Sequence, residues 1–335
     1  MTAAPAAVLP TRRLGRTSVQ VTELSFGGAA IGNLFTEVSD DDARAAVDAA
    51  WAGGIRAFDT APHYGLGLSE RRIGQALKDR PRDEYVLSTK VGRLIEPAPP
   101  GAAGHDTEGY AVAAGLTRRF DFSADGVRRS LDASLERLGL SRVDIALIHD
   151  PDDHGEQAFR EAYPALEKLR AEGVVRAIGA GMNQAGMLTR FVRDTDVDVV
   201  LVAGRYTLLD QSAAEELLPA AAARDVSVIA GGVFNSGLLA APAPGATYDY
   251  ETASAALLTR ALDLRTACER YGVPLRAAAA RFPLAHPAVA SVLLGLRNAA
   301  EVTDALAMRA TGIPPRLWDE LAPGRPDRGT DGSRP

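Results

Sequence analysis

Four polar side chains of different chemistry follow strand-like segments of the sequence. The stretch FDTAPHYG places Asp59 at the end of an apolar run and Tyr64 five residues later. Two further apolar runs, YVLSTK and VDIALIH, end at Lys90 and His149. A carboxylate, a phenol, an ammonium group and an imidazole that met in one place could make the tyrosine a proton donor.

A tyrosine is a reluctant proton donor at neutral pH, because its unperturbed pKa is about 10. An adjacent Lys90 would favour the phenolate and lower the pKa of Tyr64, and Asp59 would hold the ammonium in place. His149 would orient a substrate oxygen through a hydrogen bond. This set suits the interconversion of a carbonyl and an alcohol. Each residue alone also has an ordinary reading, as a helix cap, a surface lysine or a core histidine, but the combination favours catalysis.

The sequence alternates between strand-like and helix-like segments. Helical patterns cover residues 39–52, 69–78, 123–138, 157–171 and 213–224, and several of them begin with a Ser or Asp cap. A barrel of eight such repeats gathers its catalytic groups at the carboxyl ends of the strands. We therefore predict a (β/α)8 TIM barrel. Its candidate strands are Leu24–Gly28, Ile55–Asp59, Tyr85–Val91, Val143–His149, Val174–Ala180, Val197–Ala203, Val226–Gly231 and Ala290–Leu294.

Length and composition agree with an ordinary enzyme. The chain has 335 residues, 46% of them hydrophobic, and a formal net charge of −6. A barrel of this type needs roughly 250 residues, so we expect a single domain over residues 14–320. A basic surface for nucleic acid is not indicated, and neither a membrane-spanning run nor a secretory signal is evident, so we expect a cytoplasmic protein. The single cysteine, Cys268, excludes an internal disulfide; we expect it at a buried helix position, and we expect no metal site.

Three segments fall outside the barrel pattern. LGRTSVQV is typical of a turn between two short strands that would cap the bottom of the barrel. The stretch from Gly92 to Phe122 is rich in Gly, Pro and Ala and long for a connection, so we interpret it as a long loop after the third strand that covers the substrate. Residues 1–13 and 322–335 are expected to be flexible tails.

The motifs resemble those of the aldo-keto reductases. FDTAPHYG, STK and LIHD are similar to the catalytic Asp, Tyr, Lys and His of that family and occur in the same order. LGRTSVQVTELSFGGAAIG, SERRIGQAL and GLRNAAEV extend the resemblance from about Leu14 to Met308. IHDPDDH and GAGMNQ are most similar to its sugar-oxidising branch, which includes aldose dehydrogenases and a pyridoxal dehydrogenase.

The resemblance implies a nicotinamide cofactor bound without a Rossmann fold. Gln184 occupies the last position of a G-x-G-x-x-G pattern, so the dinucleotide motif is incomplete. In such barrels the loops after strands seven and eight commonly hold phosphate, and here they read GGVFNSGLL and GLRNAAEV, although any one glycine could simply form a turn. Asn183 matches the residue that holds the carboxamide, after Met182 in place of a serine. The expected cofactor contacts are Gly28, Asn183, Gly231, Gly232, Phe234, Gly237, Leu238, Gly295, Arg297, Asn298 and Glu301.

Two departures from the family pattern bear on the cofactor. Gly231 stands where many relatives carry the aromatic ring that stacks under the nicotinamide, and Phe234 is the candidate substitute. Gly295 and Glu301 stand where NADP-selective relatives often carry Lys and Arg, and a carboxylate would repel the extra phosphate. We therefore favour NAD, while Arg297 keeps NADP possible.

The leading hypothesis is an NAD(P)-dependent oxidoreductase acting on the anomeric carbon of a small aldose, of the D-threo-aldose or L-fucose type, or on a similar alcohol or aldehyde. One alternative is a reductase or dehydrogenase of pyridoxal or of general aldehydes. A non-catalytic nucleotide-sensing subunit is an alternative of another class. We expect a small-molecule substrate and a monomer or small homo-oligomer. The expected substrate contacts are Phe35, His63, Tyr206 and Asn235.

Overall fold

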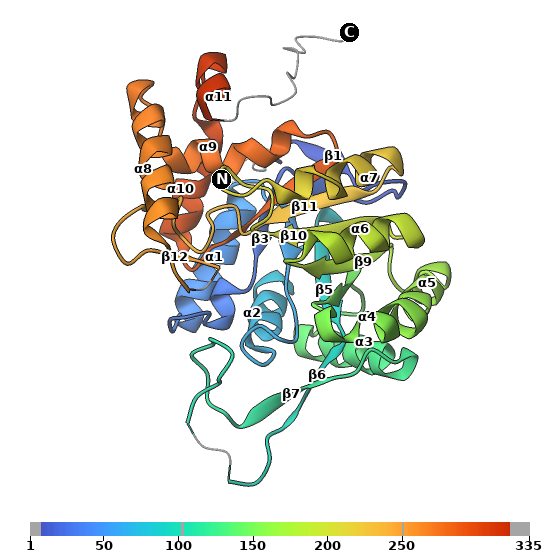
Figure 1. Cartoon of the computed structure of the whole chain (residues 1–335). Helices are drawn as coiled ribbons and strands as arrows, with labels where there is room; N and C mark the ends of the chain where they lie inside the picture. Colours follow the sequence, from blue (N-terminus) through green and yellow to red (C-terminus); the bar gives the residue numbers. More distant parts are fainter. Residues whose placement is uncertain (1–7, 102–103, 250, 322–335) are drawn as a thin grey trace, which may run out of the picture.

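The computed structural model describes residues 8–101, 104–249 and 251–321. In this part of the chain, parallel strands close into a barrel and confirm the predicted fold (Figure 1). Each barrel strand pairs with the next in chain order, and the last pairs with the first, where Val292 lies opposite Leu24. The barrel strands are β3 (Leu24–Gly27), β4 (Ala57–Asp59), β5 (Val86–Val91), β8 (Ile145–His149), β9 (Ala177–Met182), β10 (Val199–Ala203), β11 (Ser227–Gly231) and β14 (Val289–Gly295).

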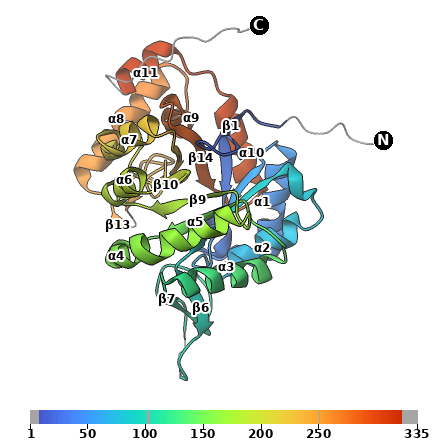
Figure 2. The same ribbon diagram turned by 90° about the vertical axis from the view of Figure 1, so that its right-hand side faces the viewer.

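Helices lie around the outside of the barrel (Figures 1 and 2). Ser39 and Ser123 begin α1 and α3, because each side chain accepts a hydrogen bond from a backbone N–H of the first turn. The predicted helix over 157–171 contains a π-helical segment, η4 (Ala158–Ala162). The helices are α1 (Asp40–Ala52), α2 (Leu68–Leu77), α3 (Ala124–Leu138), α4 (Gly155–Gln157), α5 (Tyr163–Ala171), α6 (Ala185–Asp194), α7 (Leu217–Ala223), α8 (Ala255–Arg270), α9 (Leu275–Arg281), α10 (Ala299–Ala310) and α11 (Pro315–Leu321).

A hairpin of β1 (Thr11–Arg13) and β2 (Gln20–Thr22) closes the amino end of the barrel, as the LGRTSVQV turn predicts. Leu14, Val19 and Val21 are buried against inward-facing side chains of the barrel strands. The expectation of a flexible tail through residue 13 is wrong for Thr11–Arg13, because pairing with β2 orders this segment. Residues 8–10 precede β1, and the amide of Leu9 donates to the carbonyl of Gly54 at 3.1 Å. The expected tail residues at 1–7 and 322–335 lie outside the described residues.

The segment between Gly92 and Phe122 is more ordered than the plain loop that its composition suggests. β6 (Arg93–Pro97) and β7 (Leu116–Phe120) pair antiparallel, with Arg93 opposite Phe120. This ribbon projects from one end of the barrel in both views (Figures 1 and 2). In the described chain, the Gly, Pro and Ala residues that suggest a loop lie between the two strands, at 98–101 and 104–115.

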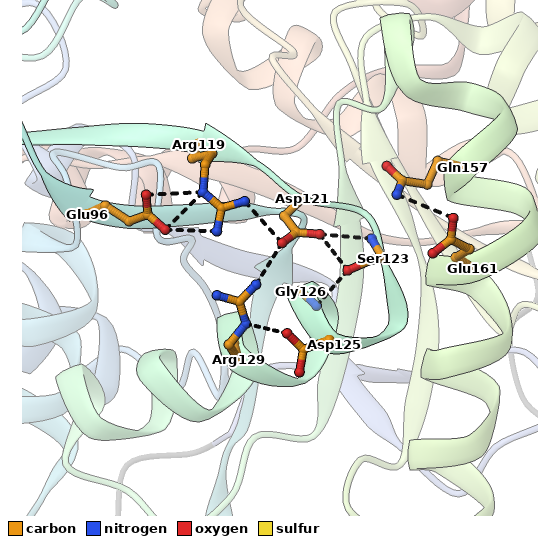
Figure 3. A network of polar contacts seen from close by, with 9 residues as sticks. All are labelled: Glu96, Arg119, Asp121, Ser123, Asp125, Gly126, Arg129, Gln157 and Glu161. Atoms are coloured by element: carbon orange, nitrogen blue, oxygen red, sulfur yellow. Dashed lines mark hydrogen bonds and ion pairs between the residues drawn. The ribbon is translucent and has the colours of Figure 1, made fainter.

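A polar network fixes the ribbon to the start of α3 (Figure 3). Arg119 bridges Glu96 on β6 and Asp121, with nitrogen–oxygen distances of 2.9 and 3.1 Å. Asp121 also accepts a hydrogen bond from Arg129 of α3 at 2.8 Å and one from the cap residue Ser123 at 2.6 Å. The ribbon therefore leaves the barrel in a defined direction.

The loop after β3 is joined to the tip of the ribbon. Leu34 forms an isolated antiparallel bridge with Tyr110. The amide of Phe35 donates to the carbonyl of Gly109 at 2.8 Å, and the side-chain amide of Asn33 donates to the carbonyl of residue 111 at 3.1 Å. Since both loops follow the carboxyl ends of barrel strands, they meet over the end of the barrel that holds the predicted site.

Cys268 lies fully buried in α8, as predicted. No helix among the described residues is long and apolar enough to cross a membrane.

Candidate active site

The predicted catalytic residues meet at the carboxyl end of the barrel. The ammonium group of Lys90 donates hydrogen bonds to Asp59 Oδ2 at 2.6 Å, to the carbonyl of Thr60 at 3.1 Å and to the phenolic oxygen of Tyr64 at 2.9 Å. Lys90 is buried, so its charge requires these three acceptors. Ser88 donates to the other Asp59 oxygen at 2.7 Å and fixes the carboxylate.

A buried ion pair behind β5 holds the strand in place. Thr89, which points away from the barrel interior, donates to Glu70 Oε1 at 2.8 Å. Arg137 of α3 pairs with Glu70 Oε2 at 2.5 Å. Glu70 is completely buried, and these bonds link α2, α3 and β5 just behind Lys90.

Two neutral histidines border Tyr64. Burial lowers the pKa of His149 well below its usual 6.5, and the positive charges of Arg93 and Lys90 act in the same direction. Burial, followed by Arg93, lowers the pKa of His63 to about 2. The His149 ring meets the Tyr64 ring edge-on, with centroids 5.7 Å apart. A neutral His149 has one N–H to donate and one nitrogen that accepts, which suits it to orienting a substrate oxygen.

Two adjoining cavities open at this end of the barrel. The reaction cavity has a volume of about 610 Å³ and is lined by Tyr64, Lys90 and His149. The groove beside it has a volume of about 770 Å³ and runs along the loops after β11 and β14. Asn183 and Phe35 line both of them. A molecule lying in the groove can therefore present one end to the phenol of Tyr64.

The groove has the properties of a dinucleotide site. Its volume lies within the roughly 300–1,000 Å³ of small-molecule sites. Gly237 has a φ of +101° and no atom within 4 Å of the place where a Cβ would stand, so a ligand can approach its backbone closely. The buried Asn235 Oδ1 lacks a protein hydrogen-bond partner among the described residues and can accept a hydrogen bond from a ligand. The residues present thus fit a nicotinamide cofactor.

Acidic residues of α10 neutralise both arginines that line the groove. Glu301 accepts hydrogen bonds from the Arg297 side chain at 2.8 and 2.5 Å and from the Arg297 amide at 2.8 Å. Asp304 pairs with Arg276 at 2.9 Å. Asn298 caps the start of α10, because its side chain accepts a hydrogen bond from the backbone amide of Glu301 at 2.9 Å. In this arrangement the charge of Arg297 is already paired.

Comparison with known proteins shows the family of this chain. The family model of the Aldo/keto reductase family matches residues 23–322. D-threo-aldose 1-dehydrogenase of a Pseudomonas species is 48% identical over 91% of this chain and 94% of its own length. Pyridoxal 4-dehydrogenase of Microbacterium luteolum is 39% identical over 92% and 96% of the two chains.

The chain belongs to the aldo/keto reductase family. It is an NAD(P)-dependent oxidoreductase. L-galactose dehydrogenase of Arabidopsis thaliana is a further relative of this aldo-keto reductase, 34% identical over 88% of the chain and 86% of its own length. Among solved structures, the aldo-keto reductase AKR11C1 from Bacillus halodurans in its holo form matches with a TM-score of 0.74, at 26% identity over 93% and 95% of the two chains.

The structure brings most of the expected cofactor and substrate contacts of this aldo-keto reductase to the two cavities. His63 lines the reaction cavity, and Phe35 stands where the cavities join. Asn235, expected at the substrate, lies in the groove instead, because its loop turns along the groove after β11. The other groove-lining residues from the expected set are Asn183, Gly232, Phe234, Gly237, Gly295, Arg297, Asn298 and Glu301.

Four expected contacts do not line either cavity. Tyr206 is buried, with its ring centroid 5.1 Å from that of Phe282, so its apolar face packs in the core. Leu238 is likewise a core residue. Gly28 serves close packing, since a Cβ there would lie 2.5 Å from Ser69 Oγ. Gly231 ends β11 inside the barrel wall, one residue before the groove begins.

Sequence reasoning missed part of the reaction cavity. Arg93, Glu108, Tyr110 and Asp150 line it together with the expected residues. Asp150 directly follows His149 and Arg93 stands three residues after Lys90, so their position after barrel strands was the available signal. Glu108 and Tyr110 reach the cavity only because the ribbon folds back toward the loop after β3, which no local pattern shows.

Proposed function

We propose that this aldo-keto reductase oxidises the anomeric carbon of a small aldose to the lactone. The bond from Lys90 to the phenolic oxygen of Tyr64, inside a cavity that charged side chains help to line, carries this proposal. The similarity to D-threo-aldose 1-dehydrogenase and L-galactose dehydrogenase supports a sugar substrate. A nicotinamide bound in the groove would supply the hydride acceptor.

In this proposal Tyr64 holds and moves the proton. During oxidation the C1–H bond breaks with loss of a hydride, the C1 hydroxyl proton passes to the Tyr64 phenolate, and the C1=O bond of the lactone forms. Lys90 stabilises the phenolate as a charged donor 2.9 Å away, and Asp59 keeps that ammonium group aligned. During reduction the same phenol returns the proton to the developing alkoxide.

His149 and Asn183 position the reactants in the proposed mechanism. Since its lowered pKa favours the neutral ring, His149 presents an N–H without adding positive charge beside Lys90. Asn183 lines both cavities, so its amide is suited to hold the carboxamide at their junction. These two side chains would hold the substrate and the nicotinamide side by side, and such positioning strongly influences the rate.

We also propose that NAD is preferred to NADP. The pairing of Arg297 with Glu301 supports this preference, because the arginine is not free to receive a 2′-phosphate and the carboxylate repels one. Arg276 is held by Asp304 in the same way. Phe234 lines the groove and remains the candidate for stacking under the nicotinamide.

A panel of aldoses, pyridoxal and simple aldehydes tests the proposal, with NADH and NADPH formation or consumption followed by absorbance. We expect the highest kcat/KM for a small aldose with NAD. Pyridoxal oxidation is the second candidate, which the similarity to pyridoxal 4-dehydrogenase supports. Turnover of pyridoxal alone would replace aldose oxidation as the function. Nucleotide binding without turnover of any panel member would indicate a nucleotide-sensing role instead.

A further inference from the structure

Four charged side chains that the proton transfer does not use line the reaction cavity; Asp152 is exposed, and the other three are linked through Arg93. These three residues, Arg93, Glu108 and Asp150, are called the charged rim below, and all of them line the cavity beside Tyr64. Arg93 begins β6, Glu108 lies near the tip of the ribbon, and Asp150 follows β8. Three separate loops thus bring charge to one place, although a simple aldehyde would be served by apolar walls.

Arg93 is the centre of the charged rim. Its side chain is 8% exposed, and one terminal nitrogen pairs with Asp150 Oδ2 at 2.6 Å. The other terminal nitrogen lies 3.7 Å from Glu108 Oε2. Its Nε is buried and has no hydrogen-bond partner among the described residues. A buried guanidinium that makes one close ion pair keeps further N–H groups available for an acceptor, and leaving such groups unpaired is costly.

Asp150 is held in an unusual backbone conformation at the cavity wall. Its φ is +41°, in the left-handed region that side chains other than glycine seldom adopt. Its amide donates to the carbonyl of Gly181 at 3.1 Å, and Oδ2 lies 3.4 Å from His149 Nε2 as well as beside Arg93. The carboxylate therefore reaches the immediate neighbourhood of the substrate oxygen and keeps Oδ1 available as an acceptor, since its contacts to Arg93 and His149 use Oδ2.

Glu108 completes the rim with a loosely held carboxylate. Its Oε2 lies 3.7 Å from His63 Nδ1 and 3.9 Å from Arg118 Nε, in addition to its approach to Arg93. These distances are too long for good hydrogen bonds. A hydroxyl group of a ligand that lay between two of these side chains would bridge them by hydrogen bonds. His63 Nδ1 is itself buried without a partner among the described residues. Donors and acceptors thus alternate around the cavity.

Alternating donors and acceptors recognise vicinal hydroxyl groups. Each hydroxyl donates one hydrogen bond and accepts others, so a carboxylate and a guanidinium side by side satisfy both functions. We propose that the charged rim binds the hydroxyl groups next to the reacting carbon and thereby selects polyhydroxylated substrates. Asp150 accepts from one hydroxyl, and Arg93 donates to a neighbouring oxygen. This inference rests on the proposed aldose oxidation and adds Asp150 and Arg93 as the residues that recognise the hydroxyl groups of the sugar.

Deoxy substrates test the rim. We compare kcat/KM for the best aldose of the panel with that for its 2-deoxy counterpart, and for glyceraldehyde with propanal in the direction of reduction. Wild type should prefer the hydroxylated partner of each pair by about 10- to 100-fold, because a hydrogen bond to a charged group is lost in the deoxy compound. In Asp150→Asn and in Arg93→Lys, each of which weakens one of the two contacts, this preference should fall at least about threefold.

Matched controls separate recognition from folding. Asp153→Asn changes an exposed carboxyl in the same loop as Asp150, and Arg128→Lys changes an exposed arginine of α3 that pairs with Glu172, away from the cavity. Both controls should keep the wild-type preference. If Arg93→Lys does not fold, as judged by thermal melting, Asp150→Asn and Asp150→Ala decide alone.

The outcomes are distinct from those of the proposed function. A variant that lowers both members of a pair by the same factor acts on structure or on His149, and that result overturns hydroxyl recognition. A wild type that does not distinguish hydroxylated from deoxy compounds also overturns it. A wild type that prefers glyceraldehyde to propanal but oxidises no aldose would keep the rim and reject the proposed function.

Discussion

Replacing Glu301 by Gln should raise the use of NADP relative to NAD. The substitution preserves the shape of the side chain, removes the negative charge and leaves the Arg297 guanidinium without its ion-pair partner, now formed at 2.5 and 2.8 Å. The Glu301 carboxylate would therefore repel a 2′-phosphate, and it also pairs with Arg297, the cation best placed to bind that phosphate. One substitution changes both effects in the same direction.

The magnitude follows from the exposure of the pair. The side chains of Arg297 and Glu301 are 50% and 29% exposed, so solvent screens their charges strongly. A unit charge at about 5 Å then contributes on the order of 1–2 kcal/mol. The NADP to NAD ratio of kcat/KM should rise about 5- to 30-fold in Glu301→Gln. Glu301→Arg, which adds a second cation, should raise it further, and both shifts should weaken as salt is added.

The assay measures kcat/KM for both nucleotides with one aldose at low and high salt. Glu269→Gln is the matched control, because Glu269 forms the same type of ion pair with Arg265 on the exposed face of α8, away from the groove. It should leave the ratio unchanged. A wild type that already prefers NADP, together with an unchanged ratio in both Glu301 variants, would refute the assignment of this pair to the adenosine end of the groove.

Two further predictions concern Lys90 and His63. Lys90→Met removes the cation that favours the Tyr64 phenolate and should depress kcat most strongly at neutral pH; an unchanged rate and pH profile would remove Lys90 from the mechanism. Folding lowers the pKa of His63 from 6.5 to about 2. As the pH falls below 6.5, His63 therefore takes up a proton in the unfolded chain but stays neutral in the folded protein. The free energy of unfolding should therefore decrease between pH 6.5 and acid, and His63→Gln should make that slope shallower by up to about 1.4 kcal/mol per pH unit. Equal slopes from urea titrations of the two proteins at several pH values would contradict the burial of a neutral His63.

Regular patterns in the sequence predicted the barrel and the residues at its strand ends. Asp59, Lys90 and His149 each follow an apolar run, and parallel strands carry such residues to one end without further information. The register that sets Asp59 beside Ser88 and His149 beside Gly181 then produces the observed contacts. The alternation of strand-like and helix-like segments was therefore sufficient to predict that Asp59, Lys90 and His149 lie together.

Tertiary packing decided the residues that sequence reasoning misplaced or missed. Tyr206 follows β10, and its position after a barrel strand predicted a place in the cavity. Its ring instead packs in the core against Phe282. The ribbon sets Glu108 and Tyr110 over the cavity through pairing with the loop after β3, a contact between segments more than seventy residues apart. Such contacts leave no periodic signal, because they depend on the direction in which the ribbon leaves the barrel.

The central claim is that Tyr64 transfers the proton while this enzyme oxidises an aldose. It is tested most directly by kcat for the best aldose with NAD in wild type and Tyr64→Phe, alongside NADH binding followed by fluorescence. Tyr64→Phe keeps the ring and should bind NADH as wild type does, but its kcat should fall by about 10²- to 10⁴-fold, the usual contribution of general acid–base catalysis. A kcat within a few-fold of wild type, with cofactor binding intact, would contradict the account.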